Sequence, residues 1–307
     1  MTFHELFLPT IARWLGLLAL AALTGGLVVD LLVLPRGVAT LAGARESLRR
    51  WTTAAVVVLV LTSAADAIAR ARIMSGGDLA QATAALPLVL ARTHFGAIWI
   101  ARAVALALLL IVSASRAAAA RALGLALSMS VALTSSLTGH AADFGDLSLS
   151  VLVDWLHAVA ALTWTGGLFA LVLTMGRARD AWPSELVGVA ARRFSRLAGY
   201  CVLVVLASGL YNAWVQVPSF AALWTTTYGG ALAVKIALAL AIVAIGAVNR
   251  YRVLPRLGAK GAGVKLSRLV AREALIAIVV FGCTAVLTES TPKRHDSHMS
   301  HIGARLY

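Results

Sequence analysis

A series of eight apolar runs constrains this chain more than any other feature of its sequence. A helix that crosses a bilayer needs roughly 20 mostly apolar residues. Charged residues make up 13% of the chain, against about 25% in an ordinary soluble domain, which argues against a soluble enzyme. We therefore predict an all-α, polytopic membrane helix bundle of about eight transmembrane helices. The expected spans are 10–34, 50–72, 94–114, 120–141, 150–175, 195–217, 229–249 and 269–289.

The basic residues predict the orientation of the bundle. If successive loops alternate between the two sides, one set of loops and helix ends holds 18 of the 27 Lys and Arg residues. The opposite connections 142–149 and 218–228 hold none. Cytoplasmic loops are enriched in Lys and Arg, so we expect both termini to lie outside the cytoplasm of a bacterial-type inner membrane. The net charge of +14 is then explained by topology and requires no nucleic-acid partner.

A repeated pattern indicates an internal duplication. A Trp-Leu pair followed eight residues later by Thr-Gly-Gly-Leu occurs at 14–27 and again, with no gap, at 155–168. Arg102 in the third run corresponds to Lys235 in the seventh. Each half holds an even number of spans, which predicts a 4+4 parallel repeat, although such short motifs also arise by chance in a chain rich in Ala, Leu and Gly. The expected units are 1–146, 147–290 and a tail, 291–307.

Several expected spans contain charged groups, which are costly in a bilayer and often mark functional sites. Asp30, Arg70 and Glu273 lie near span ends, where snorkelling or a neighbouring opposite charge suffices. Farther inside, we expect two cations either to partner two carboxylates or to hold an anionic group, with an amide on a path between the halves. These intramembrane residues are Arg102, Lys235, Asp66, Asp154 and Asn212.

The histidines all fall on the predicted outer half of the bundle. Asp154 and His157 are three residues apart and so share a helical face, while His140 ends the preceding span and His94 begins the third. Imidazole binds copper, zinc, iron and nickel well, and a carboxylate can serve as a ligand or orient the ring. The sequence predicts a metal site from these four residues. A hydrogen-bonded packing role for the histidines is the alternative.

The tail packs three imidazoles into seven residues and follows Pro292. Histidine-rich tracts of this kind bind transition metals, so the tail is a candidate capture or delivery arm, with an ordinary polar tail as the alternative. The residues concerned are His295, His298 and His301.

The second half resembles the membrane domain of the copper resistance protein D (CopD) family over roughly 130–292, and the first half resembles it more loosely. The resemblance implies an inner-membrane component that moves copper into the cell, often beside a periplasmic copper-binding protein, CopC. These 307 residues contain no CopC-like β domain, so such a donor would be a separate protein. The family also implies that His140 and His157 are outer-side copper ligands. The matching stretches are 154–157, 164–168, 193–195, 209–212, 228–229, Lys235, 249–250, Pro255, Glu273 and Pro292.

The leading hypothesis is therefore copper uptake rather than an enzymatic reaction. The sequence has no GxxxxGK[ST] motif, so active transport would need a gradient, a partner or a downstream sink. The first alternative is a b-type haem cytochrome or a quinone-linked electron carrier, because axial histidines hold haem iron. The absence of histidine from the predicted inner half argues against two such haems. The second alternative is a sensor or assembly subunit that binds copper without conducting it. The oligomeric state stays open.

Overall fold

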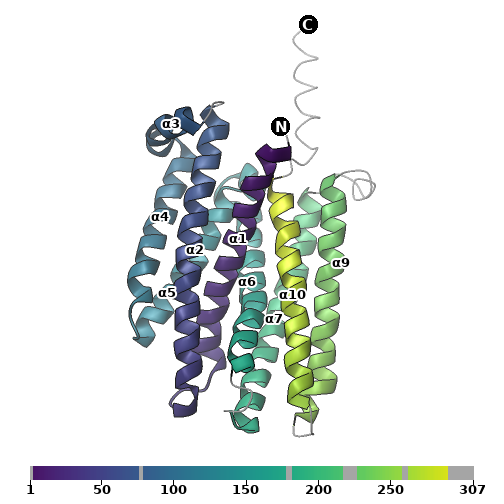
Figure 1. The fold of residues 1–307 in the computed structure, drawn as a ribbon. Helices are drawn as coiled ribbons and strands as arrows, with labels where there is room; N and C mark the ends of the chain where they lie inside the picture. Colours follow the sequence, from purple (N-terminus) through teal and green to yellow (C-terminus); the bar gives the residue numbers. More distant parts are fainter. Residues whose placement is uncertain (1–2, 76–78, 178–181, 217–226, 258–261, 290–307) are drawn as a thin grey trace.

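The computed structural model describes residues 3–75, 79–177, 182–216, 227–257 and 262–289, and it shows a bundle of long helices lying side by side (Figure 1). Two helices end in a π-helical turn, and short 3₁₀ turns join others. The helices are α1 (Phe3–Val28), α2 (Ala42–Ser75), α3 (Leu79–Arg92), α4 (His94–Ser113), α5 (Ala118–Leu137), α6 (Leu149–Arg177), α7 (Ser184–Gln216), α9 (Thr227–Val248) and α10 (Ala262–Glu289). The turns are η1 (Val29–Val33), η2 (Ala39–Leu41), η3 (His140–Phe144), η4 (Asn249–Val253) and η5 (Leu254–Arg256).

Eight of these helices are long and apolar enough to cross a membrane, which confirms the predicted all-α polytopic membrane bundle. The helix α3 was not predicted, because its 14 residues are too few to span a bilayer. In Figure 1 it lies beside α2 and α4, at the end of the bundle where α1 starts and α10 ends. We call this end of the bundle the α3 end. The opposite end, which holds the turns from α1 to α2, α4 to α5 and α9 to α10, is called the arginine-rich end.

Several helices have bounds that differ from the apolar runs. At the arginine-rich end, α7 and α10 begin at Ser184 and Ala262, ahead of the runs expected at 195 and 269. Polar residues continue a helix wherever water can solvate them, so an apolar run sets the minimum length of a spanning helix. At the α3 end, α5 stops at Leu137, and His140 begins a 3₁₀ turn instead of ending the helix.

The two central helices are α1 and α6, whose apolar segments are 72% and 61% buried, against 39% or less for the other spans. Their backbones meet where the two Thr-Gly-Gly-Leu motifs face each other. A Cβ added to Gly25 would overlap the backbone of Gly166, and one added to Gly166 would overlap the carbonyl oxygen of Ala21. Small residues are what allow membrane helices to approach this closely.

Corresponding residues of the two motifs make corresponding contacts. The indole nitrogen of Trp14 donates to the Ile278 carbonyl of α10 at 2.9 Å, and that of Trp155 donates to the Met129 carbonyl of α5 at 2.9 Å. The second glycine of each motif packs against the eleventh residue of the next spanning helix, Thr52 of α2 or Phe194 of α7. Buried apolar side chains form two cores, one mainly from α1, α2, α4 and α5 and one mainly from α6, α7 and α10, and each core also includes side chains of the other half. The parallel 4+4 repeat stays a prediction.

The glycine contact gives a direct test of the fold. We expect Gly166→Ala to lower the free energy of unfolding by about 3 kcal/mol, the upper part of the usual range for overpacking, because backbone atoms cannot rotate away as a side chain can. Gly230→Ala is the matched control, since a Cβ there meets nothing within 4 Å. Thermal unfolding of both variants in detergent checks this, and equal midpoints would contradict the close α1–α6 contact.

Candidate functional site

Asp154 joins three helices near the α3 end of the second half. It lies in the second turn of α6, and its Oδ2 accepts a 2.6 Å hydrogen bond from the Ser136 hydroxyl of α5. Its Oδ1 accepts a 3.3 Å bond from the Asn212 amide of α7. Both carboxylate oxygens are thus held by protein donors, which fixes the orientation of the carboxylate.

A fourth helix, α9, brings a cation to this cluster. Lys235 is partly buried and lies close enough to Asp154 and to His157 for electrostatic interaction with both. Opposite charges within a membrane protein usually face the bundle interior and balance each other. Lys235 and Asp154 lie within electrostatic range in one polar cluster, and a direct pairing of the two stays a prediction.

The ring of His157 points toward α7 and is held there by a serine. Its Nδ1 lies 3.0 Å from the Ser208 hydroxyl, and that hydroxyl donates to the Val204 carbonyl. A hydroxyl has a single proton to give; when Ser208 gives its proton to Val204, His157 Nδ1 is the donor and Nε2 keeps its lone pair. Gly209 leaves room for the ring, because a Cβ there would stand 3.3 Å from His157 Cε1. The nitrogen left free is the one that a metal ion could take.

His140 has a similar arrangement closer to the α3 end. Its Nδ1 lies 3.9 Å from a carboxylate oxygen of Asp143, while its Nε2 is buried without a hydrogen-bond partner in the described part of the chain. A buried polar atom left unpaired calls for an explanation. A carboxylate on one ring nitrogen with the other nitrogen free is the usual state of a metal-binding imidazole.

The two imidazoles lie on opposite sides of the Ser136–Asp154 bond. Along α6, His157 is three residues farther from the α3 end than Asp154, or about 4.5 Å. Beyond the end of α5, His140 is four residues nearer that end than Ser136. The two rings therefore lie at different depths, with His157 farther from the α3 end than His140.

The other predicted ligands lie elsewhere. His94 Nε2 is 3.2 Å from an Asp146 oxygen, and both side chains are largely exposed. Among the residues that the structure describes, no three His, Cys, Asp or Glu side chains are grouped to hold a metal ion. A copper-binding role for His94, His140, His157 and Asp154 stays a prediction. The tail residues His295, His298 and His301 lie outside the described residues.

The first half carries a different set of charges at the equivalent place. Arg102 of α4 donates to the Ser135 hydroxyl at 3.3 Å, stacks over the ring of Trp99 and interacts electrostatically with Asp66 and Arg13. These polar residues line a small cavity of about 20 Å³ between α1, α2, α4 and α5. Asp66 also lies 3.9 Å from Arg70. The side chains leave too little free volume in this cavity for it to serve as an open path for ions.

Two other charged residues near span ends are more buried than expected. Asp30 pairs with Arg45 and Arg121, and Glu273 accepts a hydrogen bond from Asn249. Both acids are buried. Snorkelling and the neighbouring Arg272 were therefore the wrong explanation, because partners from other helices or loops stabilise these carboxylates within the bundle.

Sequence reasoning missed Ser208 and Arg13. Ser208 is 51 residues from His157, so no local pattern connects them. Arg13 could have been found, because it precedes the first Trp-Leu pair just as Asp154 precedes the second. By the same alignment Gly16 corresponds to His157, so the first half has no matching imidazole.

Comparison with known protein families gives two matches along this chain. The model for Copper resistance protein D matches residues 188–287, and that for the Copper resistance protein D-like N-terminal domain matches residues 5–149. Together they cover most of the sequence. The chain belongs to the copper resistance protein D family. It is therefore a copper-related membrane protein, as the resemblance of its second half predicted.

Three curated relatives agree with this assignment. Copper transport protein CutJ of Bacillus subtilis is 35% identical over 156 residues, 51% of this chain and 28% of that protein. Inner membrane protein YebZ of Escherichia coli is 33% identical over 102 residues, 33% of this chain and 34% of that protein. Copper resistance protein D of Pseudomonas syringae pv. tomato is 27% identical over 274 residues, 84% of this chain and 88% of that protein. The first two matches thus span about a third of each relative's length. No solved structure matches this chain.

A double-mutant cycle tests whether the polar cluster of this CopD-family chain is energetically coupled. Asp154→Ala leaves Ser136 and Asn212 without their shared acceptor and removes the negative charge near Lys235, and we expect a loss of about 2 kcal/mol or more in unfolding free energy. Removing the cation as well should restore part of this loss, giving a coupling of about 0.5–3 kcal/mol. The measurement is thermal unfolding of Asp154→Ala, Lys235→Met and the double variant. Strictly additive effects would show that the two charges do not interact.

Proposed function

We propose that this chain carries copper across a bacterial inner membrane into the cell, and that His140 and His157 bind the ion in turn. The observation that carries the proposal is the shared state of these two rings. In each, Nδ1 faces a protein side chain, Ser208 for His157 and Asp143 for His140, so Nε2 is the nitrogen available to a metal ion. Neutral imidazole with its second nitrogen held by the protein is a favourable copper ligand.

The charge distribution supports the direction of entry. Most of the basic residues lie at or near the arginine-rich end, which the positive-inside rule assigns to the cytoplasm. The α3 end would then face the periplasm, and His94 and His140 would be the first imidazoles that an incoming ion meets. YebZ is named an inner membrane protein, and CutJ is named a copper transport protein; these names support copper transport at that membrane.

Transfer between the two imidazoles would follow the line of α6. An ion released by His140 reaches Asp154, whose negative charge offsets the cost of moving a cation into the bundle. Lys235 balances that carboxylate when no ion is present. Copper arriving at Asp154 competes with Lys235 for the same negative charge, and this competition limits how tightly the ion is held before His157 receives it.

The copper ion must first be delivered to the α3 end of the protein. We assign this delivery to a separate periplasmic copper-binding protein of the CopC type. The tail residues His295, His298 and His301 would serve as a capture arm. On the way to His157 the ion would pass Asn212, at the level of Asp154. From His157 inward, the route would run between the two halves, 1–146 and 147–290, toward the arginine-rich end, with Cys201 as a polar group along α7. A gradient, a partner or a cytoplasmic copper sink would drive it.

Replacement of His157 separates a ligand role from a packing role. Leu and Met have similar size, but only Met offers a copper ligand, its thioether sulfur. We expect His157→Leu to reduce copper accumulation to the level of cells that lack the protein, and His157→Met to keep a measurable part of it. Elemental analysis of cells expressing equal amounts of each variant checks this. Equal accumulation by wild type and His157→Leu would contradict the proposed path.

A further inference from the structure

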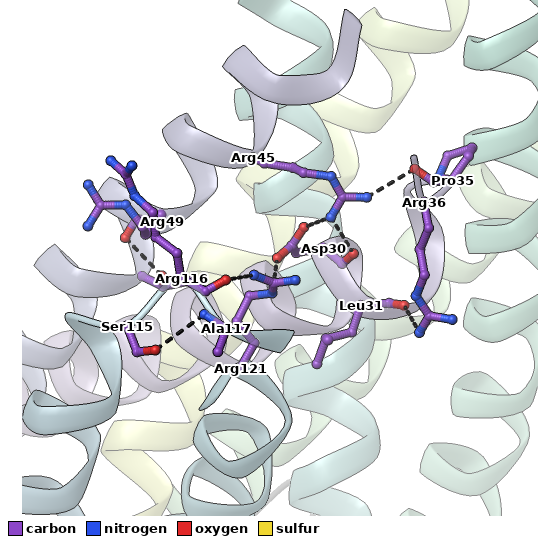
Figure 2. A network of polar contacts seen from close by, with 11 residues as sticks. Asp30, Leu31, Pro35, Arg36, Arg45, Arg49, Ser115, Arg116, Ala117 and Arg121 are labelled. Atoms are coloured by element: carbon purple, nitrogen blue, oxygen red, sulfur yellow. Dashed lines mark hydrogen bonds and ion pairs between the residues drawn. The ribbon is translucent and has the colours of Figure 1, made fainter. Parts of the chain in front are cut away.

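A cavity of about 610 Å³ lies at the arginine-rich end of the first half, between α1, α2, α4 and α5. It is distant from the proposed copper ligands His140 and His157, which lie toward the α3 end. Figure 2 shows part of its lining, where Asp30 of η1, Arg45 of α2 and Arg121 of α5 meet. The size is in the range of ordinary ligand sites.

The polar lining of this cavity has a surplus of positive charge. Five arginines line it, together with two carboxylates, Asp30 and Glu46. The surplus is three positive charges within one pocket. The five are Arg45, Arg49, Arg50, Arg116 and Arg121.

Two of the arginines are held by other groups of the protein. Asp30 is buried and pairs with Arg45 and, at 2.8 Å, with Arg121. Arg45 also donates to the Pro35 carbonyl at 3.0 Å, and Arg121 donates to the Arg116 carbonyl at 2.7 Å (Figure 2). These bonds link η1, α2 and the start of α5 at one side of the cavity.

The other three arginines share one carboxylate. Glu46 accepts hydrogen bonds from Arg49 at 2.8 Å and from Arg50 at 3.1 Å, and it lies 3.8 Å from Arg116. The side chains of Arg50 and Arg116 are 77% and 79% exposed. A guanidinium has five N–H donors, so each of these two has donors to spare at the mouth of the cavity.

The deeper wall of the cavity is apolar. It is formed by side chains of α1, α2 and α4, most of which belong to the buried core of the first half. A basic rim above an apolar wall suits a ligand with an anionic head and a hydrocarbon tail, and basic pockets between membrane helices on the cytoplasmic side bind such lipids. The apolar residues include Leu23, Leu27, Val56, Leu109 and Val112.

We propose that this cavity binds a phosphate group, that Arg50 and Arg116 hold it with support from Arg49, and that the phosphate is carried on an anionic lipid. Arginine forks match phosphate oxygens in pairs. Bound there, the phosphate would balance the charge surplus and join α2 to the loop between α4 and α5.

The full-length chain in detergent tests this by binding and thermal unfolding with three probes: phosphatidylglycerol, phosphatidylcholine and inorganic phosphate. The test variant is the double substitution Arg50→Gln/Arg116→Gln. The matched control, Arg252→Gln/Arg268→Gln, removes the same charge from exposed positions at the same end. Because all four side chains are exposed, both variants should fold, and unfolding without added probe verifies it.

We expect phosphatidylglycerol to bind wild type and control at least tenfold more tightly than it binds the Arg50/Arg116 variant, and to raise their unfolding temperature more. Phosphatidylcholine should not discriminate among the three proteins. Protection by inorganic phosphate that needs Arg50 and Arg116 would identify free phosphate as the source, and its absence would identify the lipid. Equal binding of both anionic probes by the Arg50/Arg116 variant and the control would overturn the proposal.

Discussion

The close contact between α1 and α6 determines how the rest of the bundle is arranged. Gly25 and Gly166 leave no space between the two backbones, so neither helix can slide or rotate against the other without a clash. This contact sets the relative depth of the side chains on α1 and α6. Trp14 and Trp155 reach the backbones of α10 and α5 at equal distance, and Arg13 and Asp154 lie at matching positions beside them.

Within this shared frame, the two halves differ in charge. Near the α3 end, the first half gathers Arg13, Arg102 and Asp66 around a nearly filled cavity. In the second half, Asp154 and Lys235 lie beside an imidazole that has no counterpart in the first. The same backbone arrangement thus gives a positively charged, closed cluster on one side and a balanced cluster with a metal-binding group on the other. We therefore assign copper to the second half.

The spans and the family could be predicted from the sequence because both depend on local patterns. A bilayer requires long apolar helices, and the Thr-Gly-Gly-Leu motifs are readable without a structure. The partners of buried charges could not be predicted, since Asp30 binds Arg121 of α5 and Glu273 binds Asn249 of η4. The relative depth of His140 and His157 also required coordinates, because α5 ends before His140 instead of carrying it.

The central claim is that copper passes along α6 by way of His157, and copper flux into sealed vesicles tests it most directly. Purified protein is reconstituted in vesicles that contain a copper-sensitive dye, and copper is added outside. The account predicts saturable entry with wild type and with the Arg252→Gln/Arg268→Gln variant, and none with His157→Leu. Copper that binds to the wild-type protein but never reaches the dye would contradict the account and identify a subunit that binds copper without conducting it.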